Sequence, residues 1–265
     1  MTETPTTTCT VTTGGLRTLL ATVARFAGTD DTLPMIKSVM LHTAMHRQVP
    51  QLVATATDRF VLGQMHIEAT GALPGDKLVP LDEVKRALAM LKLADPLSLI
   101  ELSVVDDGLR LAGNRMTITL ELRDDSFPKV GKLFDTPKPT EPVGEVAFNG
   151  PFLAKFSAVA KEISEGMPGR HSMRVEHSSK TRPAFITIGD CFRGLIMPMR
   201  MPDEGMPEVP FFISATEQAL LDDATAERAE AEQKAKRSAA AKKAAATRRA
   251  NAAGKPAGRS GKAAA

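Results

Sequence analysis

Between residues 9 and 203, one pattern of hydrophobic and polar positions occurs three times along the chain. Each occurrence begins with a short strand and continues with apolar residues three and four positions apart, which is the spacing of an amphipathic helix. Each then ends in short segments whose polarity alternates from residue to residue, as in half-buried strands. An internal repeat of this kind predicts a chain of equivalent βαβββ units.

The predicted helices and strands form three equivalent sets. The first repeat has a strand at 9–12, a helix whose apolar face is Leu16, Leu19, Leu20 and Val23, and strands at 36–44, 52–57 and 61–68. The second has a strand at 77–80, a helix with Leu81, Val84, Leu88 and Leu91, and strands at 98–105, 109–112 and 115–122. The third has a strand at 145–148, a helix with Phe152, Phe156, Val159 and Ile163, and strands at 171–177, 184–188 and 192–197. Asn149 is the expected N-cap of this last helix, with Pro151 in its first turn.

These repeats predict an α+β fold with the helices on one side and antiparallel sheets on the other. One βαβββ unit cannot bury both its helix and its sheet, so it must pack on a neighbour. The expected division is a two-repeat domain at 9–130, a proline-rich linker at 131–143, a half domain at 144–205 and a tail at 206–265.

Charge is distributed unevenly between the body and the tail. From Lys234 to the end the chain has ten Lys or Arg and no acidic residue, whereas the net charge of the whole chain is +3. The body is therefore acidic. The tail lacks the apolar side chains for a core, so we expect most of it to be disordered. It either binds phosphates loosely or only aids solubility.

Little in the sequence favours an enzyme. Cys9 and Cys191 cannot form a disulfide framework, and the five histidines have no metal-ligand spacing. We expect Cys191 to be a strand residue rather than a nucleophile, and we expect neither a metal nor a cofactor. No apolar run approaches the roughly 20 residues of a membrane helix, and Met1–Thr8 does not resemble a secretion signal. A cytoplasmic location without membrane contact is expected.

The helix faces opposite the apolar stripes carry basic residues that could contact DNA. Phosphate contacts of this kind bind duplex DNA without sequence specificity and weaken as salt rises. The alternative is that these are ordinary solvated helix faces. Because Trp and Tyr are absent, single-strand binding by base stacking is disfavoured. The candidate DNA contacts are Arg17, Arg25, Lys85, Arg86, Lys92, Lys155 and Lys161.

Several motifs, in order and spacing, resemble the bacterial sliding clamp family, the β subunit of DNA polymerase III. They are residues 30–35, 56–62, 127–130, 148–149 and 197–201. The resemblance implies an apolar pocket that receives short peptides from partner proteins. Its first wall would be Thr57, Arg59, Phe60 and Leu62, and its second Ile196, Met197, Pro198, Met199, Arg200 and Met201. Methionines suit such a pocket because they adapt to several ligands.

The resemblance implies a processivity factor that binds duplex DNA, a DNA polymerase and a clamp loader as a ring-shaped homo-oligomer. The alternative is a clamp-like adaptor that does not encircle DNA and competes for clamp-binding proteins. The chain has three repeats, which match the third, fourth and sixth of the six in the family. Either a partner's repeat or residues 207–221 would have to complete the third repeat. The shortness suggests a phage-encoded member.

Overall fold

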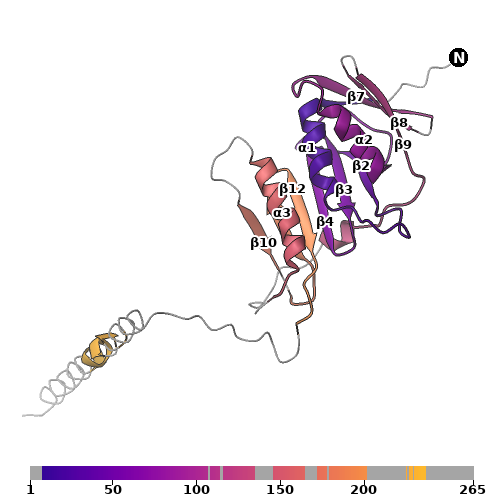
Figure 1. Cartoon of the computed structure of the whole chain (residues 1–265). Coiled ribbons are helices and arrows are strands. Elements are labelled where there is room, and N and C mark those ends of the chain that lie inside the picture. The colour runs from indigo at the N-terminus through magenta and orange to yellow at the C-terminus, as the bar shows by residue number, and fades with distance from the viewer. Residues whose placement is uncertain are drawn as a thin grey trace, which may run out of the picture. The chain divides into compact units, whose positions relative to one another are not determined.

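The computed structural model describes residues 8–106, 108–113, 116–134, 146–164, 172–177 and 179–201, together with 225–236 except 226 and 229. The chain divides into two compact units, Met1–Gly205 and Met206–Ala265. The first unit contains antiparallel sheets and helices (Figure 1), which confirms the predicted α+β class.

The three repeats appear in the structure with nearly the predicted boundaries. The first contains β1 (Thr8–Thr12), α1 (Thr13–Ala24), β2 (Ser38–His46), β3 (Val49–Thr57) and β4 (Val61–Glu68), followed by β5 (Thr70–Gly71). The second contains β6 (Lys77–Pro80), α2 (Leu81–Leu91), β7 (Leu99–Val105), β8 (Gly108–Gly113) and β9 (Met116–Glu121). A short 3-10 helix, η1 (Gly131–Phe134), follows in the predicted linker. The third contains α3 (Gly150–Ile163), β10 (Met173–Glu176), β11 (Ala184–Ile188) and β12 (Phe192–Ile196).

Three local predictions differ from the structure. The described part of the strand expected at 145–148 forms one bridge, between Ala147 and Met199. Asn149 is the N-cap of α3 as expected, but its side chain makes no capping bond, whereas Thr12 accepts a bond from Gly15 N at 3.2 Å at the start of α1. Cys191 lies in the turn between β11 and β12 and not in a strand. The elements themselves persist because their apolar faces, rather than their caps, stabilise them.

The first two repeats are tied together by an exchange of strands. β1 of the first repeat pairs with β7 of the second, and β6 of the second pairs with β2 of the first, both antiparallel. In each case the first strand of one repeat lies beside the second strand of the other. Neither repeat therefore has a complete sheet without its neighbour.

The third repeat joins the first through a continuous sheet. Its order is β10-β11-β12-β4-β3-β2-β6, and Gly194 of β12 lies opposite Gly63 of β4. Both glycines are covered by phenylalanine rings: a Cβ on Gly63 would lie 2.3 Å from Phe26, and one on Gly194 would lie 2.5 Å from Phe156. Because these two rings pack with their centroids 4.9 Å apart, the β4–β12 seam depends on the absence of both side chains.

The helices form one layer on the sheets, with α1 in contact with both α2 and α3 (Figure 1). The apolar residues of all three helices contribute to one hydrophobic core. Leu16 and Leu19 of α1 and Phe156 of α3 are fully buried in it. The periodicity of the sequence thus identified the faces that meet in the core.

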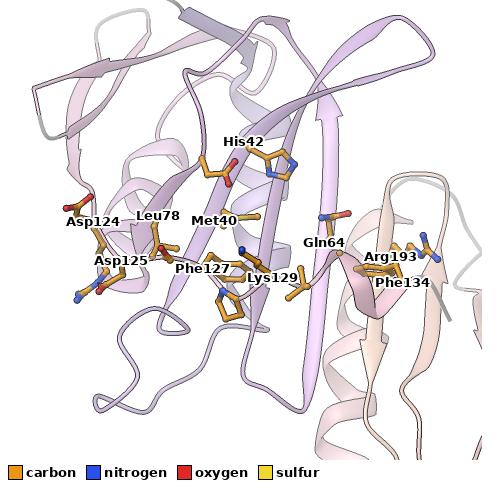
Figure 2. A pocket seen from close by; sticks show the side chains of 16 residues that line it. Met40, His42, Gln64, Leu78, Asp124, Asp125, Phe127, Lys129, Phe134 and Arg193 are labelled. Atoms are coloured by element: carbon orange, nitrogen blue, oxygen red, sulfur yellow. The ribbon is translucent and has the colours of Figure 1, made fainter.

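The segment after β9 crosses the sheet face opposite the helices. Figure 2 shows this segment lying across strands of the seven-stranded sheet. Its residues line a cavity of about 790 Å³ together with strand residues such as Met40 and Gln64. Arg193 of β12 lies over the Phe134 ring at 4.6 Å from its centroid. The described part of the linker therefore contacts the third repeat, where Phe134 also packs near Phe185. The rest of the expected linker, 135–143, lies outside the described residues.

In the second compact unit, the described residues between 225 and 236 are helical and exposed. Glu232 and Lys236 form an ion pair at 2.6 Å, one helical turn apart. These residues are good helix formers without an apolar face, so the helix is exposed to solvent. In the part of the chain that the structure describes, no helix has the length and apolar character to cross a membrane.

Candidate partner-binding site

The two segments expected to form a pocket lie side by side in the structure. Ile196 pairs with Val61 at the end of the β4–β12 ladder. One residue further, Met197 N donates a hydrogen bond to Phe60 O at 2.8 Å. The backbone bonds that close the seam therefore place residues 57–62 next to residues 196–201.

The first segment is a tight turn held by its own side chains. Asp58 Oδ1 accepts bonds from Phe60 N at 3.0 Å and Val61 N at 2.9 Å. Thr57 Oγ1 donates to Val61 O at 2.8 Å and accepts from Arg59 N at 3.1 Å. These bonds hold Arg59 at φ +81°, a left-handed conformation that is unusual for a residue with a Cβ. Strain of this kind persists where the surrounding structure enforces it, often at binding sites.

Helix α3 connects this turn to the third repeat. Lys155 Nζ forms an ion pair with Asp58 Oδ2 at 2.9 Å, so the Asp58 carboxylate binds the turn with one oxygen and α3 with the other. The Phe152 ring stacks on Phe60 at a centroid distance of 6.0 Å, and Lys155 lies 5.5 Å from the Phe152 centroid. The site is thus braced from α3 as well as from the strands.

The second segment continues beyond β12 as an extended arm. Met199 N donates to Ala147 O at 2.8 Å, which fixes the arm beside the start of α3. Met199 is 49% exposed, close to the 51% of Phe60 in the facing turn. Two large apolar side chains therefore reach solvent on neighbouring segments, where a partner could contact both.

The ten predicted pocket residues fall into two groups. Thr57, Leu62 and Ile196 are buried, so they position the segments and cannot meet a partner directly. The rest are exposed or half-buried: Arg59, Phe60, Met197, Pro198, Met199, Arg200 and Met201.

Sequence reasoning missed Asp58, Phe152 and Lys155 as parts of this site. It placed Phe152 on an apolar helix face and Lys155 among the DNA contacts. Asp58 lies inside a motif that the resemblance identified, but its bonds to the turn and to Lys155 appear only in the fold.

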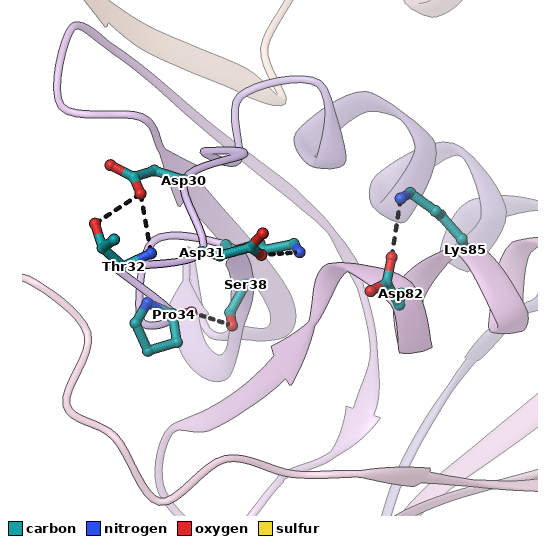
Figure 3. Close-up of polar contacts among 8 residues, drawn as sticks. Asp30, Asp31, Thr32, Pro34, Ser38, Asp82 and Lys85 are labelled. Carbon is teal, nitrogen blue, oxygen red and sulfur yellow. Dashed lines mark hydrogen bonds and ion pairs between the residues drawn. The ribbon is translucent and has the colours of Figure 1, made fainter.

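Most of the predicted DNA contacts are engaged by nearby acidic side chains. Arg25 pairs with Glu162 of α3 at 2.7 Å, and Lys85 pairs with Asp82 at 2.9 Å (Figure 3). The hydrogen bond from Lys85 lowers the pKa of Asp82.

Two further members of the set are also held within the protein. Arg86 pairs with Glu83 and donates to Thr119 O at 2.7 Å, and Lys155 pairs with Asp58. Among the described residues, Arg17, Lys92 and Lys161 form no ion pair. DNA binding by the seven basic residues stays a prediction.

The motif at 30–35 builds a structural turn. Asp30 Oδ1 accepts bonds from Thr32 N at 2.9 Å and Thr32 Oγ1 at 2.6 Å, and these bonds lower the pKa of Asp30 (Figure 3). Ser38 Oγ donates to Pro34 O at 3.0 Å and so connects the turn to the start of β2. This motif therefore holds the chain that enters β2 of the first repeat.

The cysteines have the properties of structural thiols. Burial raises the pKa of Cys9 to about 11, and burial together with Asp190 raises the pKa of Cys191. Both stay protonated at neutral pH, and a thiol is a weaker nucleophile than a thiolate. Among the described residues, no group of three or more His, Cys, Asp or Glu side chains could hold a metal ion.

Solved sliding clamps have the same fold. The DNA polymerase sliding clamp from Caulobacter crescentus matches with a TM-score of 0.61 and 16% identity, over 76% of this chain and 68% of that one. The DNA polymerase III β subunit from Thermotoga maritima matches with a TM-score of 0.59 and 17% identity, over 76% and 68%. The clamp from Bartonella birtlesii bound to griselimycin matches with a TM-score of 0.58 and 16% identity, over 74% and 66%.

These likenesses show the clamp fold, and the chain spans about two thirds of the length of the clamps it matches. No protein-family model and no curated protein matches the sequence. The comparisons give no support to a phage origin.

Proposed function

We propose that this protein is a sliding-clamp processivity factor, which holds duplex DNA and recruits a DNA polymerase and a clamp loader. One observation carries the proposal: Met197 N donates a hydrogen bond to Phe60 O at the seam. Because of this bond, the two segments expected to form the pocket are neighbours. Its exposed apolar side chains, braced from α3, suit a short peptide with a few apolar anchors. Arg59 and Arg200 at the rim would favour a peptide that also carries acidic groups.

DNA binding is proposed for the helix layer. Arg17, Lys92 and Lys161 are the members of the basic set without an ion pair among the described residues, so they are the first to substitute. The logarithm of the affinity falls linearly with the logarithm of the salt concentration, and each lost phosphate contact should make this slope less negative by about 0.9. The basic tail is a second source of phosphate contacts.

The proposal is tested by primer extension with a bacterial DNA polymerase III on a primed circular template. We expect Met199→Lys to remove the stimulation of synthesis while retention of the protein on circular DNA stays unchanged. Met45→Lys is the matched control, since Met45 is an exposed methionine on β2, at 66%. Loss of both activities in Met199→Lys would show that the residue serves the fold instead.

One observation favours the alternative of a clamp-like adaptor that does not encircle DNA. Four of the seven basic residues, namely Arg25, Lys85, Arg86 and Lys155, are already paired with carboxylates. An adaptor would bind the polymerase equally well but would inhibit extension by a complete clamp. Equal retention on circular and linear DNA, with inhibition in place of stimulation, would replace the first proposal by this one.

A further inference from the structure

The three repeats place their first strands in the same way. Three residues before its helix begins, each first strand pairs with the segment that follows the repeat's last strand. The pairs are Thr10 with Thr70, Leu78 with Arg123, and Ala147 with Met199. The third repeat therefore has the same local geometry as the other two, and its positions correspond one to one with theirs.

What the third repeat lacks, among the described residues, is the exchange of strands. In the first two repeats, the other edge of each first strand lies against the partner repeat, as in the pairs Val11 with Ile100 and Val79 with Val39. Residues 146–148 have no such partner in the described part of the chain, and β10 is an edge of its sheet. The third repeat thus has two unpaired segments among the described residues. They are its first strand, at 146–148, and the outer edge of its second strand, β10.

On the helix-facing side of this edge the side chains are apolar and exposed, whereas Arg174 and Glu176 on the other side form an ion pair. Met173 and Val175 of β10 lie opposite Ile188 and Ile186, which are buried under α3, so all four are on the helix-facing side of the sheet. Met173 is 37% exposed and Val175 is 44% exposed.

The corresponding second strands of the first two repeats are covered. Their helix-facing residues have exposures of 0–2%, namely Val39, Leu41, Ile100 and Leu102. The difference in exposed fraction shows that, in the third repeat, no neighbouring repeat covers the helix-facing residues of the second strand, as far as the described residues show. An apolar strand edge left open in this way promotes association.

We propose that a second copy of this chain covers the edge. Residues 146–148 of each copy pair with β10 of the other, and the two α3 helices pack together as α1 and α2 do. A two-fold axis satisfies both edges at once, because the third repeat carries both halves of the exchange. Two third repeats then form a complete domain across the axis. The proposal rests on strand pairing alone and does not require DNA or peptide binding.

The first test is the mass of the full chain in solution, measured by light scattering. We expect an even multiple of the 28.3 kDa chain, because every copy needs one other copy to complete its third repeat. A monomer or an odd multiple would overturn the proposal. A monomer whose β10 amides are nevertheless protected from hydrogen exchange would show that the chain's own residues cover the edge.

The second test uses the double variant Met173→Lys with Val175→Lys. Two ammonium groups per copy would have to be buried at the axis, which is costly for unpaired charges. We expect the mass of the assembly to fall by half while the helical circular dichroism is retained. Val49→Lys is the matched control, since Val49 is an exposed strand valine at 39%, and should keep the full mass. An unchanged mass in the double variant would place the contact elsewhere and refute the pairing.

A third measurement needs no variant, in case the double variant does not fold. Hydrogen exchange of β10 in the wild-type protein should slow as concentration rises through the dissociation range, whereas exchange of β7 should not change. Equal exchange of β10 at all concentrations, in a protein whose mass does change, would also contradict the proposal.

Discussion

The first two repeats are completed by each other, whereas the third shares one strand ladder with the first and leaves its other side open. Both arrangements use the same βαβββ unit. In the first case the helix-facing residues of the second strands, such as Val39 and Ile100, are fully buried. In the third repeat Val175 at such a position is 44% exposed. The comparison teaches that one sequence pattern can either be completed by a neighbouring repeat or leave an apolar strand edge exposed.

The largest expected effect tests whether the third repeat shares the core of the other two. Phe156→Ala should cost about 3–5 kcal/mol, because it leaves a cavity where the Phe26 and Phe192 rings now pack. We expect hydrogen exchange to accelerate first in β11 and β12, measured against β7 and β8. Leu93→Ala is the control, since Leu93 is 90% exposed. Equal acceleration in all strands would mean that the three repeats unfold together.

The next effect concerns the seam itself. In Gly194→Ala the added Cβ would lie 2.7 Å from Leu62 O, and a backbone oxygen in a ladder cannot move aside easily. Overpacking of this kind costs about 1–3 kcal/mol. Gly150→Ala is the control in the same repeat, because nothing lies within 4 Å of its Cβ position. A seam variant as stable to urea as the control would show that the β4–β12 contact contributes little.

A smaller effect on the free energy of unfolding, in the stabilising direction, is expected in the turn that contains Arg59. Arg59→Gly should raise the free energy of unfolding by roughly 1 kcal/mol, because glycine adopts positive φ without the penalty of a Cβ. Urea denaturation measures it, with Arg200→Gly as the control on the facing arm. Polymerase stimulation should fall in the same variant if Arg59 contacts a partner. Destabilisation by Arg59→Gly would mean that its side chain, rather than the bonds of Asp58, holds the turn.

The smallest expected effect is a pH dependence of stability that arises in the first repeat. Burial lowers the pKa of His42 on β2, so the folded protein keeps this ring neutral while the unfolded chain takes up a proton near pH 6.5. Stability should therefore fall as the pH drops from about 6.5 toward the folded pKa, and then level off. His42→Gln should flatten this part of the profile, whereas Met45→Gln, at an exposed and non-titrating position on the same strand, should not. A profile unchanged by His42→Gln would assign the acid sensitivity to another group.

The sequence was enough to predict the three repeats, because each helix and strand has its own hydrophobic period. It also singled out the segments at 57–62 and 196–201, which lie side by side in the structure, because their motifs are local. It could not predict the exchange of β1 and β6, because a strand's polarity does not identify its neighbour. The role of Lys155 was missed for a related reason: its charge suits phosphate and carboxylate equally, and Asp58 becomes its partner only in the fold.

If the proposed peptide binding occurs, the seam between β4 and β12 has a thermodynamic consequence for it. A peptide that contacts both Phe60 and Met199 binds only while the seam is closed, so its binding free energy adds to the cost of opening. At a hundredfold excess over its Kd, such a ligand would stabilise the closed seam by about 2.7 kcal/mol. By the same linkage, any change that destabilises the packing of the third repeat lowers the affinity for the peptide. Each partner protein would thus stabilise the β4–β12 seam to which it binds.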